Sequence, residues 1–173
     1  NNTEQMKMIK KGELDITFSR HNINNDEIES QFVLREPLIF ILPKDHPLAK
    51  YERIPVKALN GIDFIIPSAE QSQTLHHTIL DFAKANGIEF NIVQKVDNIL
   101  FHIDSIGMGL GCTILPDYIA PLIMDNTVVR PLDVELPHLD LYISYGKNSH
   151  SAAVHQFMVL LMRVFYSDIK REQ

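Results

Sequence analysis

The segment 67–74 concentrates the residues of this sequence that are best suited to bind a small anion. It follows an apolar run, precedes a helical pattern, and is rich in hydroxyl and amide side chains, among them Ser68, Ser72, Gln73 and Thr74. The first N–H groups of a helix lack partners within the helix, and the helix dipole adds positive potential there. Such a turn therefore predicts a site for an anion such as a carboxylate. The simpler interpretation is ordinary helix capping, which stabilises a helix by about 1 kcal/mol.

Two further helix starts and one arginine could contribute to the same kind of site. Asn2 and Thr3 open one predicted helix, and Asp97 is the expected N-cap of another. Arg20 comes directly after the strand-like run 14–18, where its guanidinium could pair bidentately with a carboxylate. The alternative for Arg20 is a solvated surface side chain. In open α/β sheets, ligands bind beyond the carboxyl ends of the strands, where such turns collect. The helix starts and Arg20 could therefore contribute to one ligand site.

Other kinds of site find less support in the sequence. The glycine-rich segment 107–111 comes between a helical pattern and a strand, the reverse of the order in a dinucleotide-binding turn. His76 and His77 are adjacent, so they cannot chelate a metal as an i,i+4 pair would. Cys112 lies in an apolar run and is expected to be a buried thiol. We therefore predict no catalytic residue, no metal and no cofactor, and we do not expect an enzyme.

Composition and charge limit the environment and the partners of the chain. Its 173 residues carry a formal net charge of −6, a poor electrostatic match for DNA phosphates, so contact with DNA would need another domain. One cysteine allows no internal disulfide and suits a reducing cytosol. No apolar run approaches the ~20 residues that cross a bilayer. The polar start, 1–11, predicts a helix and not a signal peptide. We expect a cytoplasmic protein.

Apolar strands alternate with amphipathic helices along the chain. The runs 38–43 and 63–67 are nearly continuously apolar, which is typical of strands buried on both faces. Such alternation predicts an α/β fold with a largely parallel sheet. One helix is expected to face Ile99, Ile103 and Ile106 inward. The predicted strands are 14–18, 38–43, 63–67, 91–96, 112–115, 128–130 and 139–145, and the predicted helices are 3–11, 74–86, 98–108 and 150–168.

Several short runs, in this order and spacing, resemble the effector-binding domain of bacterial LysR-type transcriptional regulators. The resemblance spans essentially the whole chain. Run 15–20 is similar to muconate- and benzoate-responsive members, and run 106–111 to the phenylpropionate-responsive member, which indicates the branch that senses aromatic acids. The runs that carry the resemblance are 12–16, 36–38, 42–49, 98–100, 106–111, 114–116 and 129–132.

The resemblance implies a bilobal fold. Two Rossmann-like lobes would be joined by two crossover strands, as in type II periplasmic binding proteins, with the effector in the cleft between the lobes. Lobe I would hold residues 1–42 and 129–173, lobe II would hold 43–128, and the crossovers would be 38–43 and 128–132. The family's domain begins with a strand and a helix that this sequence lacks, so we expect it to be N-terminally incomplete. The helix-turn-helix DNA-binding domain is likewise absent from it.

The resemblance also assigns effector-binding residues. Asn2 stands at a helix start that contacts effector carboxylates, where many relatives have Thr or Ser. The turn 72–74 matches the turn of lobe II over the cleft, where benzoate-type members carry an apolar and aromatic pair, so this pocket is expected to be more polar. Arg20 matches an arginine near the pocket. The predicted site residues are Asn2, Thr3, Arg20, Ser68, Ser72, Gln73, Thr74 and Phe101.

The function that the resemblance implies is that of a sensor. A small carboxylate, aromatic or derived from an aromatic, would bind in the cleft and favour one lobe arrangement, which changes oligomer geometry and transcription. Expected partners are the effector, further copies of the chain in a dimer or tetramer, and DNA only through the helix-turn-helix domain, with no membrane. Two alternatives stay open. One is an enzyme for a small acid on the same fold, marked by an acid–base pair with shifted pKa values. The other is a transport-type solute-binding protein, marked by a secretory signal.

Overall fold

The computed structural model describes residues 2–147 and 152–169, which fall into two compact units. The first unit combines Asn1–Arg35 with Asp140–Gln173, and the second is Glu36–Leu139. The boundaries therefore lie several residues away from the predicted ones at 42/43 and 128/129. The difference has a physical cause, because residues 38–43 pair with strands of the second unit. The segment after residue 129 also belongs there, since a β-bridge joins it to the second unit through Leu132 and Ile54.

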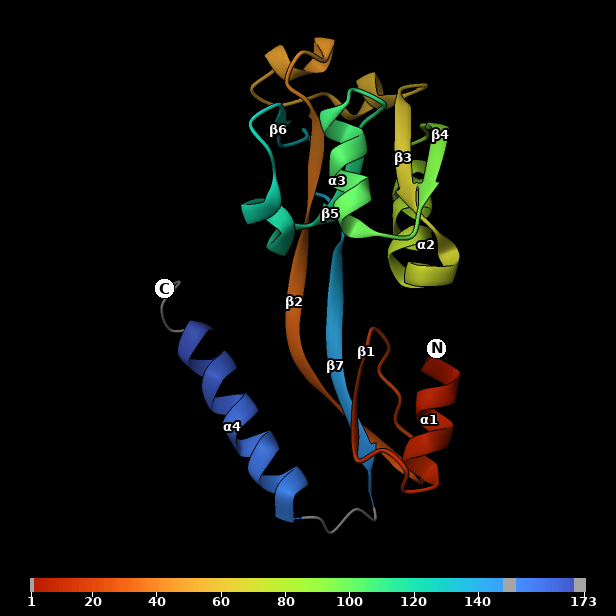
Figure 1. Ribbon diagram of the computed structural model, residues 1–173, viewed down its shortest axis with the longest axis vertical. Helices are drawn as coiled ribbons and strands as arrows, with labels where there is room; N and C mark the ends of the chain where they lie inside the picture. The colour runs from red at the N-terminus through yellow and green to blue at the C-terminus, as the bar shows by residue number, and fades with distance from the viewer. Residues whose placement is uncertain (1, 148–151, 170–173) are drawn as a thin grey trace. The chain divides into compact units, whose positions relative to one another are not determined.

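Two strands contain residues of both units, β2 (Ile28–Pro43) and β7 (His138–Gly146) (Figure 1). They are the crossover strands that the resemblance implied, but the second was expected at 128–132 and lies in β7. The predicted range 38–43 is only the continuously apolar end of β2. Its first part, 28–37, mixes buried and exposed side chains, so it lacks the signal of a fully buried strand.

In the first unit, β7 lies between β1 (Ile16–Ser19) and the start of β2. β1 pairs antiparallel with β7. The buried hydroxyls of Ser30 and Ser144 lie 2.7 Å apart and form a hydrogen bond inside the unit. The helices are α1 (Asn2–Lys10) and α4 (Ala152–Ile169), close to the predicted 3–11 and 150–168.

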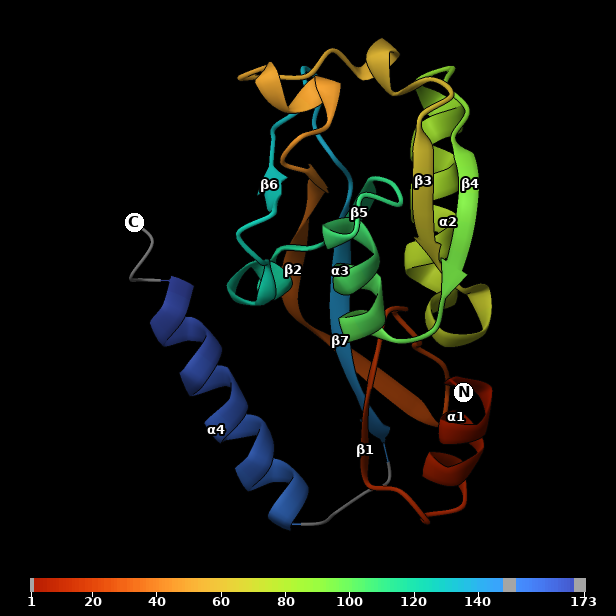
Figure 2. The ribbon, with the colours of Figure 1, turned by 45° about the horizontal axis from the view of Figure 1, so that its top comes forward.

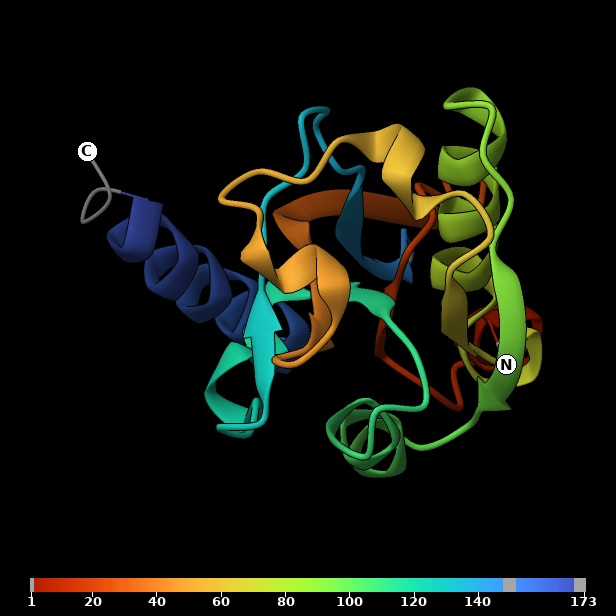
Figure 3. The same ribbon diagram turned by 90° about the horizontal axis from the view of Figure 1, so that it is seen from above.

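The second unit contains a parallel strand pair, β3 and β4, and the end of β2 with two antiparallel neighbours, β5 and β6. Figures 2 and 3 both show α2 running along the β3–β4 pair, and Figure 3 shows α3 nearly end-on. The bounds are β3 (Asp63–Pro67), α2 (Ala69–Ala85), β4 (Asn91–Val96), α3 (Ile99–Gly107), β5 (Thr113–Pro116) and β6 (Thr127–Val129), with short 3-10 helices η1 (Pro47–Lys50), η2 (Val56–Leu59) and η3 (Asp117–Leu122).

The prediction of a largely parallel sheet was wrong. The pairs β1–β7, β2–β5 and β2–β6 are antiparallel, and among the registered pairs of the described residues only β3–β4 is parallel. Burial on both faces makes a strand continuously apolar whichever way its neighbours run. The apolar run at the end of β2 therefore indicated burial without indicating direction.

A single apolar core holds the helices of the second unit against its strands. Phe40 of β2, Ile79 of α2 and Ile106 of α3 are at most 1% exposed. Phe64 of β3 stacks on Phe90 with ring centroids 4.1 Å apart. Non-directional burial of this kind fixes how closely α2 and α3 approach the strands.

The glycine-rich segment 107–111 forms the predicted turn from a helix into a strand. Met108 is the C-cap of α3, and Gly109 follows with a φ of 80°, a conformation that glycine adopts without steric cost. At Gly111 a Cβ atom would lie 2.8 Å from the Asp63 carbonyl oxygen. Only glycine lets this backbone approach β3 so closely, so the interpretation of the segment as a turn is confirmed.

Candidate functional site

The carboxyl ends of β3 and β4 meet at one edge of the second unit. Because the strands are parallel and end on the pair Pro67 and Val96, the residues that follow them lie side by side (Figure 2). Ser68 follows β3, and its backbone N–H donates to the Val96 carbonyl at 2.9 Å. The Ser68 hydroxyl, which is 5% exposed, donates to a carboxylate oxygen of Asp97, the residue that follows β4. The structure thus joins two chain segments 29 residues apart into one polar edge.

Ser68 is also the N-cap of α2, and its hydroxyl oxygen accepts from the Gln71 N–H at 3.4 Å. The helix therefore begins at Ala69, earlier than the predicted start at residue 74. It is nevertheless interrupted at Ser72, whose φ of −140° and ψ of 67° are not helical. A helix that restarts has a new first turn, whose N–H groups are again short of partners within the helix. The break places that second start at Gln73 and Thr74, inside the predicted turn.

The side chains around the break are accessible to a ligand. Ser72 and Thr74 are half-buried and Gln73 is exposed, whereas Leu75 is 5% exposed and anchors the restarted helix in the core. Two hydroxyls and an amide beside the N–H groups of a helix start can together donate several hydrogen bonds to a carboxylate. The structure therefore brings Ser68 and the run 72–74 onto the start of one helix.

The start of α3 lies beside this edge, but it is built differently from the prediction. Asn98 is the N-cap, and its side-chain oxygen accepts from the Leu100 N–H at 2.8 Å and the Phe101 N–H at 3.3 Å. Asp97 was expected in that role and does not fill it, because its carboxylate is engaged by Ser68. Phe101, on the first turn of α3, is 52% exposed, so its ring is available to an apolar ligand group.

The inward face of α3 also differs from the prediction. Ile103 and Ile106 are buried as expected, but Ile99 is 38% exposed, and His102 is buried instead at 2%. The Nε2 atom of His102 lies 3.2 Å from the Ile65 carbonyl oxygen. That contact with β3 satisfies a polar group that would otherwise be costly to bury.

His76 is a residue of this edge that the site prediction did not include. Its Nδ1 lies 2.7 Å from the Pro67 carbonyl oxygen, at the end of β3. It is half-buried and stands one helical turn after Ser72, a spacing that could have indicated a shared face. Its ring meets that of His77 edge to face at 5.7 Å. Within the residues that the structure describes, no group of three His, Cys, Asp or Glu could hold a metal ion.

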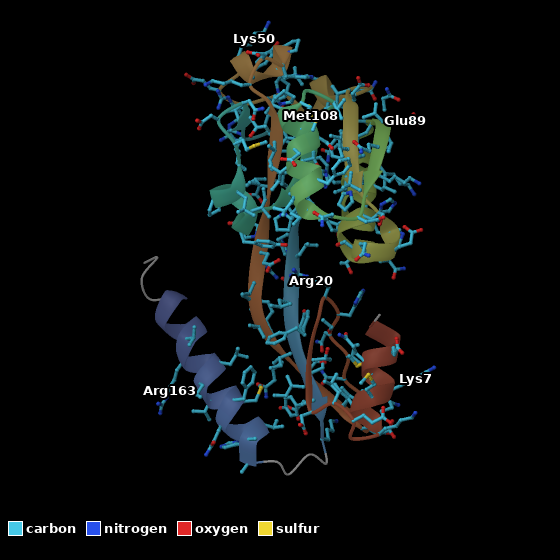
Figure 4. All side chains as sticks on the ribbon, in the orientation of Figure 1. Lys7, Arg20, Lys50, Glu89, Met108 and Arg163 are labelled. Carbon is cyan, nitrogen blue, oxygen red and sulfur yellow. The ribbon has the colours of Figure 1, made fainter. Side chains whose placement is uncertain are left out.

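The predicted residues of the first unit are Asn2, Thr3 and Arg20. α1 begins at Asn2, and the side chains of Asn2 and Thr3 lie outside what the structure describes. Arg20 follows β1 directly, as predicted, and Figure 4 labels it there. It is half-buried with its Nη1 shielded from solvent, so it is not the fully solvated side chain considered as the alternative. That Arg20 binds the same effector as the residues of the second unit stays a prediction.

Burial is the main cause of the large pKa shifts in the second unit. It lowers the pKa of His102 to about 4, against the opposing effect of the hydrogen bond with the Ile65 carbonyl. It raises the pKa of the Cys112 thiol to about 12, helped by the Asp63 carboxylate, and confirms Cys112 as a buried thiol. Burial thus keeps both groups neutral near pH 7. In the described part of the chain, no helix is long and apolar enough to span a bilayer.

Comparisons with known proteins agree with the architecture. A family model described as LysR substrate binding domain matches residues 1–165. The Hca operon transcriptional activator HcaR of Escherichia coli (strain K12) is 31% identical over 159 residues, which cover 92% of this chain and 54% of HcaR. The chain spans about half the length of the curated relatives that match most of it.

Two solved structures share the fold. The BenM effector binding domain with its effector benzoate has a TM-score of 0.82 at 15% identity, over 97% of this chain and 77% of that one. The Synechocystis PCC6803 CcmR regulatory domain in complex with 2-PG has a TM-score of 0.79 at 20% identity, over 95% and 80%. The predicted fold class is therefore confirmed. Together with the family match along nearly its whole length, this shows that the chain belongs to the LysR substrate-binding domain family.

Proposed function

We propose that this chain is the sensing part of a LysR-type transcriptional regulator and that it binds a small carboxylate at the start of α2. Ser72, Gln73 and Thr74 would hold the carboxylate, and Phe101 would contact the apolar part of the ligand. Arg20, Asn2 and Thr3, which belong to the first unit, remain effector-binding residues by the family resemblance alone.

The observation that carries this proposal is the break of α2 at Ser72. An uninterrupted helix from Ala69 would use the N–H groups after Ser72 in its own hydrogen bonds, and the break instead supplies a second helix start beside the polar edge. Hydrogen bonds to a charged group contribute about 1.5–3 kcal/mol each. Two such bonds that form in only one conformation of the domain would be enough to favour that conformation strongly.

The nature of the ligand follows from the mixture of surfaces. Hydroxyl and amide groups near Ser72 suit a carboxylate, and the exposed ring of Phe101 suits an aromatic or other flat apolar group. The likeness to the BenM effector binding domain with its effector benzoate supports a carboxylate of aromatic origin. The more polar turn 72–74 favours a ligand with additional polar groups.

The rest of the regulator would lie outside this sequence. Its net charge of −6 does not suit DNA, so operator binding would fall to a helix-turn-helix domain elsewhere in the protein. We further propose a cytoplasmic homodimer or homotetramer whose geometry responds to the carboxylate, without catalysis. The matched relatives carry the names of transcriptional regulators, and no specific observation favours the enzyme or the transport-type alternative.

The test is calorimetric titration of the chain with benzoate, with 3-phenylpropionate and, as a neutral control, with benzamide. Binding of either acid but not of the amide is expected. Ser72→Ala should weaken the acids roughly tenfold or more, because it removes a hydroxyl and favours an unbroken helix. Thr78→Ala, another half-buried hydroxyl on α2, is the matched control and should bind normally. Failure of both acids to bind, or normal binding by Ser72→Ala, would overturn the proposal, and turnover of a bound acid would favour an enzyme.

A further inference from the structure

A buried polar cluster lies beneath the candidate site and joins three elements of the second unit. His102 of α3 is 2% exposed, and its Nε2 lies 2.9 Å from the Thr113 hydroxyl of β5. The same Nε2 lies 3.2 Å from the Ile65 carbonyl of β3. The Thr113 hydroxyl in turn donates to that carbonyl at 2.8 Å. One ring on α3 therefore contacts both β3 and β5.

The proton count fixes the role of each atom. The Thr113 hydroxyl has one proton, which goes to the Ile65 carbonyl, so its oxygen must accept the bond from His102. His102 therefore carries its proton on Nε2, and a neutral ring satisfies the cluster. Because burial holds its pKa at about 4, the ring is neutral near pH 7.

The remaining buried side chains of α3 do not fix its register. Ile103 and Ile106 contribute apolar burial, which is non-directional and tolerates small rotations or shifts of the helix. The Ser105 hydroxyl bonds within its own helix, to the Phe101 carbonyl at 2.8 Å. Among the buried side chains of α3 in the described part of the chain, only that of His102 forms hydrogen bonds to strands, and such bonds weaken steeply when their geometry changes.

The cluster is directly connected to both helix starts of the site. The backbone N–H of His102 donates to the backbone carbonyl of Asn98, the N-cap of α3, at 3.0 Å. On the other side, Ile65 lies three residues before Ser68, the N-cap of α2, along the rigid strand β3. A change in the contact between His102 and Ile65 would therefore move Phe101 relative to the start of α2.

We propose that His102 is a positioning residue of the effector site, which sets the register of α3 on β3 and so places Phe101 for the ligand that α2 holds. The inference rests on the proposed function and adds a residue that does not touch the ligand. It predicts that replacing His102 weakens ligand binding more than another core substitution that lowers the stability by the same amount.

The test compares four variants by urea unfolding, by titration with benzoate and 3-phenylpropionate, and by amide NMR spectra without ligand. His102→Leu removes the bonds, and His102→Gln keeps a donor near the position of Nε2. Ile103→Val lowers stability without changing a hydrogen bond, and Ser105→Ala removes a buried hydroxyl that bonds only within α3.

We expect His102→Leu to lower the affinity for 3-phenylpropionate roughly tenfold, which is about what the loss of one neutral hydrogen bond costs. The ratio of the affinities for 3-phenylpropionate and benzoate should also change. His102→Gln should stay within roughly threefold of the original chain, and the two controls should bind normally. Amides of residues 98–101 should shift in His102→Leu but not in Ser105→Ala.

The outcomes separate the two proposals. Unshifted amides at 98–101 in His102→Leu, or equal loss of affinity in Ile103→Val at equal stability, would overturn the positioning role. Shifted amides in His102→Leu, in a chain that binds neither acid, would support the positioning of α3 and reject the proposed function instead.

Discussion

Mild acid should destabilise the second unit through His102, and the size of the effect follows from its burial. Burial lowers the pKa of this histidine from 6.5 to about 4, against the opposing hydrogen bond with the Ile65 carbonyl. Between these two pH values, His102 is therefore protonated in the unfolded chain but not in the folded chain. The resulting stabilisation is complete above pH 6.5 and is lost as the pH falls towards 4.

The magnitude is accessible to ordinary unfolding measurements. Each pKa unit corresponds to about 1.4 kcal/mol, so the interval from 6.5 to 4 amounts to about 3 kcal/mol in total. Between about pH 7.5 and about pH 5, roughly 2 kcal/mol of this should be lost. The surroundings add little charge, since no charged group contributes to the shift of the His102 pKa, β5 has no ionisable side chain and Asp104 of α3 is exposed.

The assay is urea unfolding of the original chain and of His102→Gln at both pH values, followed by circular dichroism. Glutamine does not titrate, so the variant should lose about 2 kcal/mol less stability than the original chain. Other groups, including His46, whose pKa burial also lowers, are the same in both proteins and cancel in the comparison. Equal pH dependence in the two proteins would refute the reasoning, as would a His102 ring that titrates near 6.5 by NMR.

Three further predictions concern the surroundings of the site. Gly111→Ala should lower the free energy of unfolding by about 1–3 kcal/mol in urea titrations, because its Cβ would lie 2.8 Å from the Asp63 carbonyl; an unchanged midpoint would contradict this close approach. Ser68→Ala should cost about 1 kcal/mol at neutral pH through loss of the α2 cap, measured in the same way, whereas Ser68→Asn should restore part of it. Phe101→Ala should weaken 3-phenylpropionate more than benzoate in calorimetric titrations with little change in thermal stability, since its ring is 52% exposed; equal weakening of both acids would argue against its contact with the apolar chain.

Local patterns were sufficient where structure depends on neighbouring residues. The bounds of β3 and β4 agree with the predicted 63–67 and 91–96, because turn residues enclose each short run. The glycine turn at 107–111 also followed from residue types alone. In these segments the local residue types determine the backbone conformation, and distant contacts contribute little.

The starts of the two helices were harder to predict because they depend on a contact between them. Asp97 and Asn98 are both good N-cap residues, and Asn98 has the role because Ser68, 29 residues earlier, engages Asp97. The first turn of α2 contains no side chain of the apolar stripe, which begins at Leu75, so the pattern placed the start too late.

The buried histidine illustrates a different limit of sequence patterns. The apolar stripe was read from residue type, so it included Ile99 and omitted His102, although residue 102 lies on the same helical face; Ile99 is 38% exposed and His102 is 2% exposed. The helix can bury a polar ring because Thr113 and the Ile65 carbonyl provide partners on two strands. Partners that lie 11 and 37 residues away along the chain leave no trace in local periodicity.

The most direct test of carboxylate binding at the break of α2 is an amide NMR titration of the chain with benzoate. The account predicts saturable shifts of the Gln73, Thr74 and Leu75 amides, with smaller shifts at Phe101, and no such response to benzamide. Saturable shifts confined to other parts of the chain, with the amides of 73–75 unmoved, would contradict it.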